Sequence, residues 1–386
     1  MIGFQWKPGR KSVEIPFELH ANLVVIPLRI NDSDTLRFLV DTGLGATLLT
    51  DTSIVSKLGL KSIRTVELNG LGIHKSLKAN VVIDVKLQVG PAFALHQNLI
   101  YVSDDLLNIS NSIGTKIQGI IGFDLFANVV VTIDYARSRL ILTQPASYRY
   151  KKRKGLRLPI TIIDNKPYIN QVELTGMRGK LANQILLDTG AGHVLLLEAN
   201  TADSVEIKLS KQRFDLGKGL NGPIIGRWGR VPLMQIGQWK WLQIPATFPD
   251  SISRKSGEPW QGSLGGEFLR RFKITFNYLD QYFILKPECN QWRKDFDYGM
   301  SGIGLRALGP QYRKFIVETI HPGSPADEAG ILVGDEIWVI NQMRADQFTM
   351  GDIFRILKKR EGQKIEMMIR RDREFRLFQF RLRKLF

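Results

Sequence analysis

The stretch Leu39-Val40-Asp41-Thr42-Gly43 is repeated later in the chain as Leu186-Leu187-Asp188-Thr189-Gly190. In both copies an apolar run leads into Asp-Thr-Gly, a glycine follows two positions further on (Gly45 and Gly192), and a second apolar run comes next. Short apolar runs separated by glycine turns are typical of β-structure. A single copy would be read as an ordinary hairpin, but repetition of the whole pattern indicates two copies of one folded unit.

A second pair of matching segments lies downstream of the two tripeptides. Gly119-Ile120-Ile121-Gly122 corresponds to Gly262-Ser263-Leu264-Gly265, and each segment follows its Asp-Thr-Gly at nearly the same separation. Tyr135 and Tyr278 then follow the two final glycines at equal distances. Several features in the same order and at similar spacing predict a duplicated β-rich lobe.

The spacing of the apolar runs also predicts the fold class. Runs rich in Val, Ile, Leu and Phe recur at turn-sized intervals, and long helical periodicity is scarce, so we expect a mainly β fold. The strands expected in the first repeat are 23–30, 36–40, 81–89 and 129–133. A chain of 386 residues is too long for one ordinary core. The expected division is a first lobe at 12–145, a basic linker at 146–157, a second lobe at 158–287 and a small α+β domain at 298–386.

The duplicated motif resembles that of the clan AA aspartic peptidases, the pepsin and retropepsin-like family, over about residues 12–287. The resemblance implies acid-protease β-barrel lobes that form a bilobal unit, with Asp41 and Asp188 as the catalytic pair. It also implies that the two threonines of the motif hydrogen-bond across the lobe interface. The residues expected to support the active site are Thr42, Gly43, Gly122, Thr189, Gly190 and Gly265.

The chemistry of such a pair follows from its charge. Two carboxylates held a few ångströms apart cannot both ionise cheaply, so they share one proton and titrate as a unit. The ionised member can deprotonate a water while the protonated member polarises a peptide carbonyl. The sequence does not decide which of Asp41 and Asp188 is protonated. This reaction predicts a peptide or unfolded-protein substrate, no cofactor and no metal. Because one chain carries both copies, a monomer could be competent.

One departure from the family pattern and two glycine-rich segments bear on this prediction. The family often has Ser, Thr or Ala after the tripeptide; Ala191 fits that pattern, and Leu44 does not. Because neither residue carries a hydroxyl to stabilise the carboxylate, we expect activity at weakly acid rather than strongly acid pH. The glycine-rich stretches 67–78 and 215–229 predict either flaps or ordinary loops. We interpret His193, which has no metal-like spacing, as structural or exposed.

A different pattern begins after the second lobe. Gly302-Ile303-Gly304-Leu305 is followed by Ser324-Pro325-Ala326 and then by Gly334-Asp335-Glu336-Ile337, a series that resembles a bacterial-type PDZ domain. The resemblance implies that the Gly302–Leu305 loop and strand bind a peptide by strand addition. A helix with Thr349 as its N-cap would form the other wall of the groove. Alternatively, the protein's own chain fills the groove, which then serves architecture only.

Composition bears mainly on partners and location. The formal net charge is +17, but no nucleic-acid motif accompanies the basic clusters, so we expect a solvated basic surface and no nucleic-acid partner. The single cysteine, Cys289, excludes an intrachain disulfide. No apolar run is long enough to span a membrane. The combination of lobes and PDZ domain is similar to that of exported proteins of Bacteroidetes-type bacteria, which favours a periplasmic or secreted protein whose signal peptide is absent from this chain, with the cytoplasm as the alternative.

A rival function is that of a peptide-binding protein whose lobes are catalytically silent. Such a protein would bind peptides in the cleft and in the PDZ groove without cleaving them. The unbroken Asp-Thr-Gly sequences around Asp41 and Asp188 argue against it, because a silent lobe has no evident need of both acids. The sequence therefore favours an aspartic endopeptidase.

Overall fold

The computed structural model describes most of the chain. The described residues are 3–68, 70–72, 77–102, 108–176, 179–199, 201, 207–250, 261–288, 290–296 and 299–385, with the backbone alone for 179–183. Strands account for 51% of the structure and helices for 13%, which confirms the predicted mainly β class. Among the described residues, no helix is long and apolar enough to cross a membrane.

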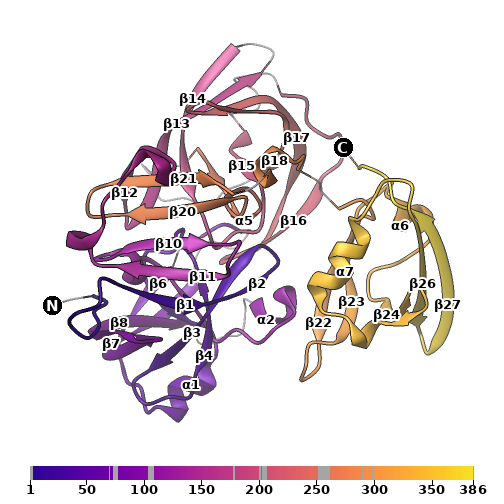
Figure 1. Cartoon of the computed structure of the whole chain (residues 1–386). Coiled ribbons are helices and arrows are strands. Elements are labelled where there is room, and N and C mark those ends of the chain that lie inside the picture. The colour runs from indigo at the N-terminus through magenta and orange to yellow at the C-terminus, as the bar shows by residue number, and fades with distance from the viewer. Residues whose placement is uncertain are drawn as a thin grey trace. The chain divides into compact units, whose positions relative to one another are not determined.

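The chain forms two compact units (Figure 1). Unit 1 contains residues 1–107, 117–210 and 216–294, and unit 2 contains 108–116, 211–215 and 295–386. Most of unit 2 is thus the C-terminal part of the chain, joined by two short segments from earlier positions. The domain boundaries expected from the sequence stay a prediction.

The first half of unit 1 is a sheet closed into a barrel. Its strand order is β2-β3-β4-β9-β5-β8-β7-β6, and a further pairing of β3 with β7 closes it. The strands are β2 (Glu18–His20), β3 (Leu23–Ile30), β4 (Leu36–Val40), β5 (Leu48–Leu49), β6 (Ser62–Leu68), β7 (Leu77–Val89), β8 (Ala92–Val102) and β9 (Gly119–Ile121). The expected strands 23–30 and 36–40 match β3 and β4 in full, and 81–89 falls within β7.

The second half repeats this topology from β3 onward. Its order is β13-β14-β19-β15-β18-β17-β16, with an additional β13–β17 pairing that corresponds to β3–β7. The strands are β13 (Lys166–Gly176), β14 (Gly179–Leu187), β15 (Leu195–Leu197), β16 (Phe214–Gly219), β17 (Gly222–Ile236), β18 (Trp239–Pro249) and β19 (Gly262–Leu264). The duplicated lobe predicted from the repeated motif is therefore confirmed as a duplicated barrel-like fold.

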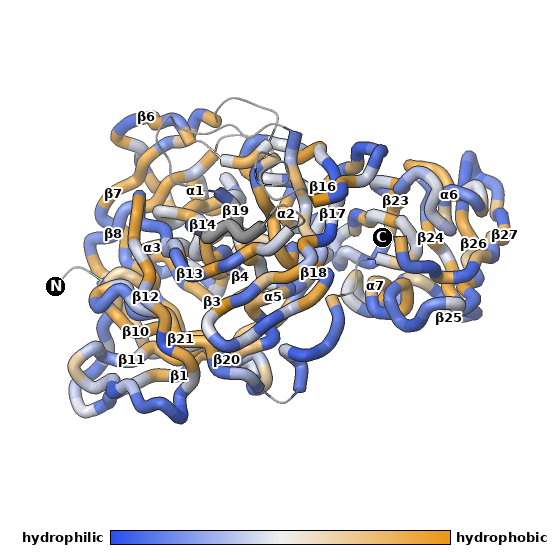
Figure 2. Tube along the Cα trace, turned by 90° about the horizontal axis from the view of Figure 1, so that it is seen from above, coloured by the Kyte–Doolittle hydropathy of each residue, from blue (hydrophilic) through white to orange (hydrophobic). Residues whose placement is uncertain are grey.

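Six further strands, in the order β1-β11-β10-β20-β21-β12, continue from β13 as part of one 13-stranded sheet and join the two lobes. The strands are β1 (Ser12–Pro16), β10 (Val130–Asp134), β11 (Arg139–Thr143), β12 (Leu156–Ile163), β20 (Phe272–Asn277) and β21 (Tyr282–Pro287). At the centre of these six strands β10 pairs with β20, and the Oγ1 atoms of Thr132 and Thr275 lie 2.8 Å apart in a buried hydrogen bond. Figure 2 shows hydrophobic residues along these strands and hydrophilic residues in the turns between them.

Helices in unit 1 are short and lie at the ends of strands. Those whose full bounds the structure describes are α1 (Thr52–Lys57), α3 (Phe123–Phe126) and α5 (Gly266–Leu269), with 3₁₀ turns η1 (Pro145–Ser147), η2 (Lys152–Lys154) and η3 (Gln291–Arg293). The helices α3 and α5 follow β9 and β19 at equivalent places in the two lobes. Their positions agree with the duplication, because each begins directly after the glycine that ends the downstream motif.

Unit 2 is a small α+β fold. Its sheet has the order β22-β23-β24-β26-β27, with β25 paired to β24. The elements are α2 (Ile109–Ile113), β22 (Ile303–Leu308), β23 (Lys314–Ile320), α6 (Pro325–Glu328), β24 (Glu336–Ile340), β25 (Met343–Arg344), η4 (Ala345–Gln347), α7 (Met350–Leu357), β26 (Lys364–Arg371) and β27 (Glu374–Arg381). As predicted, Thr349 is the N-cap of α7, and with Asp352 it forms a reciprocal capping box.

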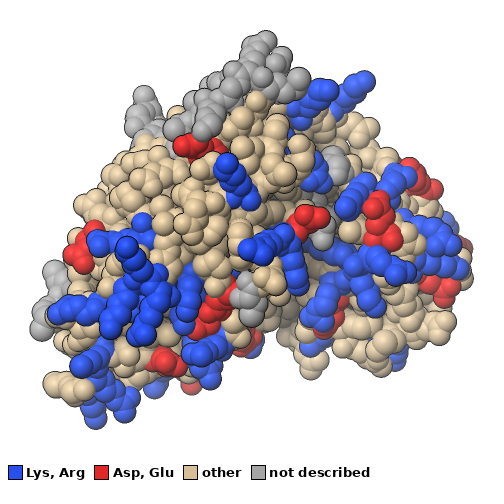
Figure 3. Space-filling model, turned by 45° about the horizontal axis from the view of Figure 1, so that its top comes forward, with Lys and Arg blue, Asp and Glu red and all other residues tan. Residues whose placement is uncertain are grey.

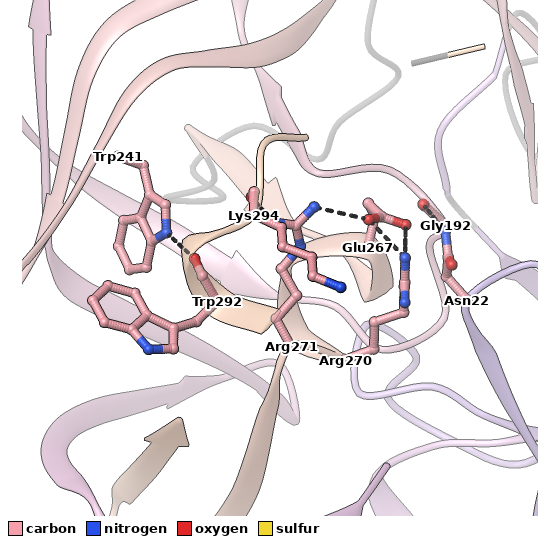
Figure 4. Close-up of polar contacts among 8 residues, drawn as sticks. All are labelled: Asn22, Gly192, Trp241, Glu267, Arg270, Arg271, Trp292 and Lys294. Carbon is pink, nitrogen blue, oxygen red and sulfur yellow. Dashed lines mark hydrogen bonds and ion pairs between the residues drawn. The ribbon is translucent and has the colours of Figure 1, made fainter. Parts of the chain in front are cut away.

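The last residues of unit 1 are fixed to the second lobe (Figure 4). Trp241 Nε1 donates a hydrogen bond of 2.9 Å to the Trp292 carbonyl, and the Arg271 guanidinium donates to the Lys294 carbonyl. Arg271 is only 7% exposed and also pairs with Glu267. Because these bonds are partly buried, the chain up to Lys294 belongs structurally to the second lobe.

The surface is strongly basic. Figure 3 shows many more Lys and Arg side chains than Asp and Glu on the face in view, in keeping with the net charge of +17. Several basic residues are nevertheless paired, including Arg371 with Asp335 and Arg383 with Glu328 in unit 2. The surface therefore mixes ion pairs with solvated cations.

We predict that the six strands joining the lobes carry much of the stability of unit 1. Phe276 is fully buried against Phe126 and Phe283, whereas Leu279 in the next turn is 56% exposed. Phe276→Ala should lower the free energy of unfolding by about 3–5 kcal/mol, because it removes buried contacts and leaves a cavity. Leu279→Ala should change it by no more than about 0.5 kcal/mol. Urea unfolding followed by tryptophan fluorescence measures both; equal losses would contradict this assignment of the core.

Candidate active site

The two Asp-Thr-Gly turns begin where β4 and β14 end. Each aspartate is held by a strand of its own lobe: the Asp41 N–H donates to the Ile121 carbonyl at 3.0 Å, and the Asp188 N–H donates to the Leu264 carbonyl at 2.9 Å. The acceptors belong to β9 and β19, the downstream motifs found in the sequence. The repeated segments are therefore neighbours in space, because they form the parallel pairs β4–β9 and β14–β19.

The glycines of the motif allow the two carboxylates to face each other. The Gly43 N–H donates to Asp41 Oδ1 at 2.7 Å, and the Gly190 N–H donates to Asp188 Oδ1 at 2.9 Å. A Cβ on Gly190 would clash with the Asp41 carboxylate, and one on Gly43 would lie 3.1 Å from Asp188 Oδ1. Each carboxylate thus lies against the glycine of the opposite turn; a side chain at position 190 would displace the Asp41 carboxylate, and one at position 43 would crowd that of Asp188.

The two threonines lock the turns together. The Thr42 N–H donates to Thr189 Oγ1 at 3.1 Å, and the Thr189 N–H donates to Thr42 Oγ1 at 3.0 Å. Each hydroxyl in turn donates to the main chain of the opposite lobe, Thr42 to Leu187 and Thr189 to Val40. Both side chains are almost completely buried. The hydrogen bonds across the lobe interface that the resemblance implied are therefore present.

Burial and mutual repulsion shift the titration of the pair. Burial raises the pKa of Asp188 well above its usual range, and the neighbouring charge of Asp41 adds to this. Burial also raises the pKa of Asp41, although the Gly43 N–H partly offsets the rise. A positive charge on Lys166 favours the ionised form of both. The two groups share a proton in the pH range in which isolated carboxyls are already ionised.

The glycines of the downstream motifs are required by close packing under the turns. A Cβ on Gly122 would clash with the Leu44 carbonyl, and a Cβ on Gly265 would clash with the His193 carbonyl. Leu44, the residue that departs from the family pattern, is itself buried. These contacts explain why a glycine ends both downstream segments.

One difference between the lobes lies beside the second turn. His193 Nε2 is 2.9 Å from Ser263 Oγ, and burial lowers the pKa of His193 to about 4. The equivalent positions in the first lobe are Ala46 and Ile120, which have no such pair. His193 therefore has a structural place in the fold, one of the two readings that the sequence left open.

Tyr278, which the sequence showed only as a marker of the repeat, lies near the pair. Its ring stacks on Phe126 with a centroid distance of 5.3 Å, and its hydroxyl is buried with no partner among the described residues. Burial raises its pKa strongly, and the charges of Asp41 and Asp188 raise it further. Tyr278 therefore remains a neutral phenol over the pH range in which Asp41 and Asp188 titrate.

The two glycine-rich stretches are hairpins whose tips meet. The hairpin of β6 and β7 contributes Leu71, and that of β16 and β17 contributes Asn221, whose N–H donates to the Leu71 carbonyl at 2.9 Å. A Cβ on Gly72 or on Gly219 would clash with the opposite tip. Leu71 also packs against an apolar cluster that contains Tyr168 and Leu186. The sequence located these stretches, but it did not predict their contact; His74, in the first stretch, lies outside the described residues.

The predicted PDZ residues lie at the edge of the sheet of unit 2. Gly302 has a φ of +80°, and a Cβ there would clash with Ser324, so this position needs glycine. Ile303 begins β22, which also contains Gly304 and Leu305. The Ser301 hydroxyl accepts the Ile303 N–H at 3.2 Å and fixes the loop before the strand. In the described part of the chain, no three His, Cys, Asp or Glu side chains lie close enough together to hold a metal ion.

The comparisons with known proteins agree with this geometry. A family model described as aspartyl protease matches residues 26–125 and 172–268, one stretch in each lobe, and a PDZ domain model matches residues 316–371. A search of curated proteins finds no match to the chain. The similarity to Bacteroidetes-type proteins stays a prediction. Because the aspartyl protease model covers about half of the sequence, the chain belongs to the aspartyl protease family and carries a C-terminal PDZ domain.

Proposed function

We propose that the protein is an aspartic endopeptidase that hydrolyses peptide bonds with Asp41 and Asp188. The observation that carries this proposal is the pair of partly buried carboxylates facing each other on turns locked by Thr42 and Thr189. Their raised pKa values allow the pair to keep one proton between them. An acid and a base within the same site are what the reaction requires.

The proposed reaction uses a water held between the two carboxylates. The ionised aspartate accepts a proton from the water as the oxygen attacks the peptide carbonyl, and the protonated aspartate donates to the carbonyl oxygen. The resulting tetrahedral intermediate breaks its C–N bond when a proton passes to the leaving amine. The glycine N–H groups of Gly43 and Gly190 hold each carboxylate in place during these transfers.

The contact between the two hairpin tips bears on how a substrate would reach Asp41 and Asp188. In this structure the Asn221 N–H bonds to Leu71, and the Leu71 side chain packs on the second lobe. We propose that these tips are flaps, which separate to admit an extended peptide and then close over it. The PDZ domain would recruit peptide or unfolded-protein substrates. We further propose that one chain is sufficient for activity, and that the protein acts in the periplasm or outside the cell.

Replacing either aspartate should abolish cleavage. In Asp41→Asn and Asp188→Asn the pair loses its general base or its shared proton, so the rate should fall by at least about 10³-fold. Cleavage of oxidised insulin B chain between pH 3 and 7, with and without pepstatin, measures this. Asp124→Asn, beside Thr47 and outside the pair, is the control and should keep most of the activity.

The outcomes separate the two readings of the lobes. If the wild type and both variants bind the peptide but none cleaves it, the silent peptide-binding function replaces the proposed one. If only one variant loses activity, the two aspartates do not act as a pair.

The pH profile should be centred above about pH 4. The active form of the pair carries one proton, and burial raises the pKa values of both members above the ordinary aspartate value of about 3.9. Activity should fall at higher pH as that proton is lost, and at lower pH as a second proton binds. Initial rates on a fluorogenic peptide across pH 2–8 test this; a maximum near pH 2 would contradict the raised pKa values.

His193 should set an acid limit on stability. Its folded pKa of about 4 lies below the unfolded value of about 6.5, so only the unfolded chain binds its proton in this window. Stability should therefore fall as the pH drops from about 6.5 to about 4, by up to about 3 kcal/mol, and this contribution should be constant below pH 4. Urea unfolding at several pH values, compared between wild type and His193→Asn, isolates this slope; parallel curves would refute it.

A further inference from the structure

A short segment from the first half of the chain packs within unit 2. Residues Asn108–Lys116 lie in sequence between β8 and β9, which are both strands of unit 1, yet by their contacts they belong to unit 2. Their helix, α2, packs against β22, and Ile113 is 6% exposed. The segment is therefore a packed part of unit 2.

The segment lies where a peptide ligand of a PDZ domain would bind. Among the described strands, β22 pairs only with β23, so its other edge is open for strand addition. Gly114 lies between β22 and α7: a Cβ on it would be 2.6 Å from Met350 Cβ and 3.7 Å from Ala307 Cβ. Met350 begins α7 and Ala307 belongs to β22, so the segment touches both walls of the groove at once.

The sequence of the segment suits this position. Gly114 ends α2 with a φ of +77°, a left-handed conformation that strongly favours glycine. Its missing side chain also provides the space that Met350 and Ala307 require. On either side of it, Ile113 and Thr115 are buried. A glycine at this point thus satisfies both the backbone and the packing.

Residues 211–215, the second short segment of unit 2, lie near the Gly302 loop at the start of the groove. The Phe214 ring stacks on His321 with a centroid distance of 5.1 Å. The His321 N–H donates to the Gly302 carbonyl at 2.9 Å, so this stacking lies beside the loop expected to bind a peptide carboxylate. Contacts from earlier parts of the chain therefore reach both the wall and the loop of the groove.

We propose that Asn108–Lys116 is an internal ligand of the PDZ groove. The segment occupies the groove in the resting protein, and an external peptide binds there only after the segment leaves. This inference is independent of catalysis, since it concerns only contacts within unit 2. It gives the groove a defined occupant, an internal chain segment in which a left-handed glycine, Gly114, follows the helix.

The segment is also connected to the candidate active site through the residues that follow it in the chain. Shortly after Lys116, the Gln118 side chain accepts the Arg37 N–H at 2.8 Å, and the Ile121 carbonyl accepts the Asp41 N–H. The groove ligand is thus continuous in sequence with the strand that holds one catalytic carboxylate. A change in cleavage rate on peptide binding would be a further consequence, and that part rests on the proposed function.

Hydrogen exchange in the wild-type full chain tests the proposal without mutation. Measured across a urea series, the amides of 109–116 should open with a lower free energy and a smaller urea dependence than those of β22, because the segment leaves the groove while the strand stays folded. If 109–116 instead opens only together with β22, or together with β8 and β9, the proposal is overturned.

A substitution at Gly114 should empty the groove. In Gly114→Val the side chain meets Met350 and the left-handed backbone is strained, so the segment should leave and β22 should exchange at least about 10-fold faster. A synthetic peptide with the sequence of residues 108–116 should then bind this variant at least about 10-fold more tightly than the wild type. Gly59→Val is the matched control, because Gly59 follows α1 with a φ of +60° and has no atom within 4 Å of its Cβ position.

The control should behave as the wild type in both exchange and peptide binding. Equal binding of the peptide to wild type and Gly114→Val, or binding to neither, would overturn the proposal. Because these readouts do not involve cleavage, they remain decisive if the peptidase function fails its own test.

Discussion

The reciprocal hydrogen bonds of Thr42 and Thr189 are the interaction on which the rest of the active site depends. The backbone N–H of each threonine donates to the hydroxyl of the other threonine. Each hydroxyl donates in turn to a main-chain carbonyl of the opposite lobe. Breaking one bond would leave buried polar groups unsatisfied on both lobes, which costs about 1–3 kcal/mol for each group. The four bonds therefore act as a unit, and they fix the distance between the carboxylates more firmly than the flanking apolar contacts could.

The duplicated topology provides a nearly symmetric frame, but the two carboxylates do not have equal surroundings. Around Asp188 the chain places the polar pair His193 and Ser263, whereas around Asp41 the equivalent positions are the apolar Ala46 and Ile120. Burial remains the largest cause of the raised pKa at both sites. In the proposed reaction the pair holds one proton between two acids, and such a difference would favour one acid as its carrier, because full symmetry would give neither acid a preferred state.

Much of the fold was predictable from the sequence, because the motifs recur in the same order and at similar spacing in both lobes. The two Asp-Thr-Gly turns located both lobes, and Thr349 with the following periodicity located α7. The contact between Leu71 and Asn221 was not predictable, because a backbone hydrogen bond between distant glycine-rich tips leaves no pattern of residue types. The place of Asn108–Lys116 was hidden for a similar reason: Gly114 contacts Ala307 and Met350, which follow it by 193 and 236 positions.

An internal ligand lowers the apparent affinity of the PDZ groove for an external peptide, because the two compete for the same groove. A tethered segment acts at an effective concentration on the order of millimolar, so even a sequence with weak intrinsic affinity can fill the groove for most of the time. The apparent affinity of an external peptide is then reduced by the fraction of chains in which the groove is open. Weak or random chain ends are rejected by this competition, while a peptide that pairs well with β22 can still displace the segment. Selectivity of the groove would thus come from Asn108–Lys116 as much as from the groove itself.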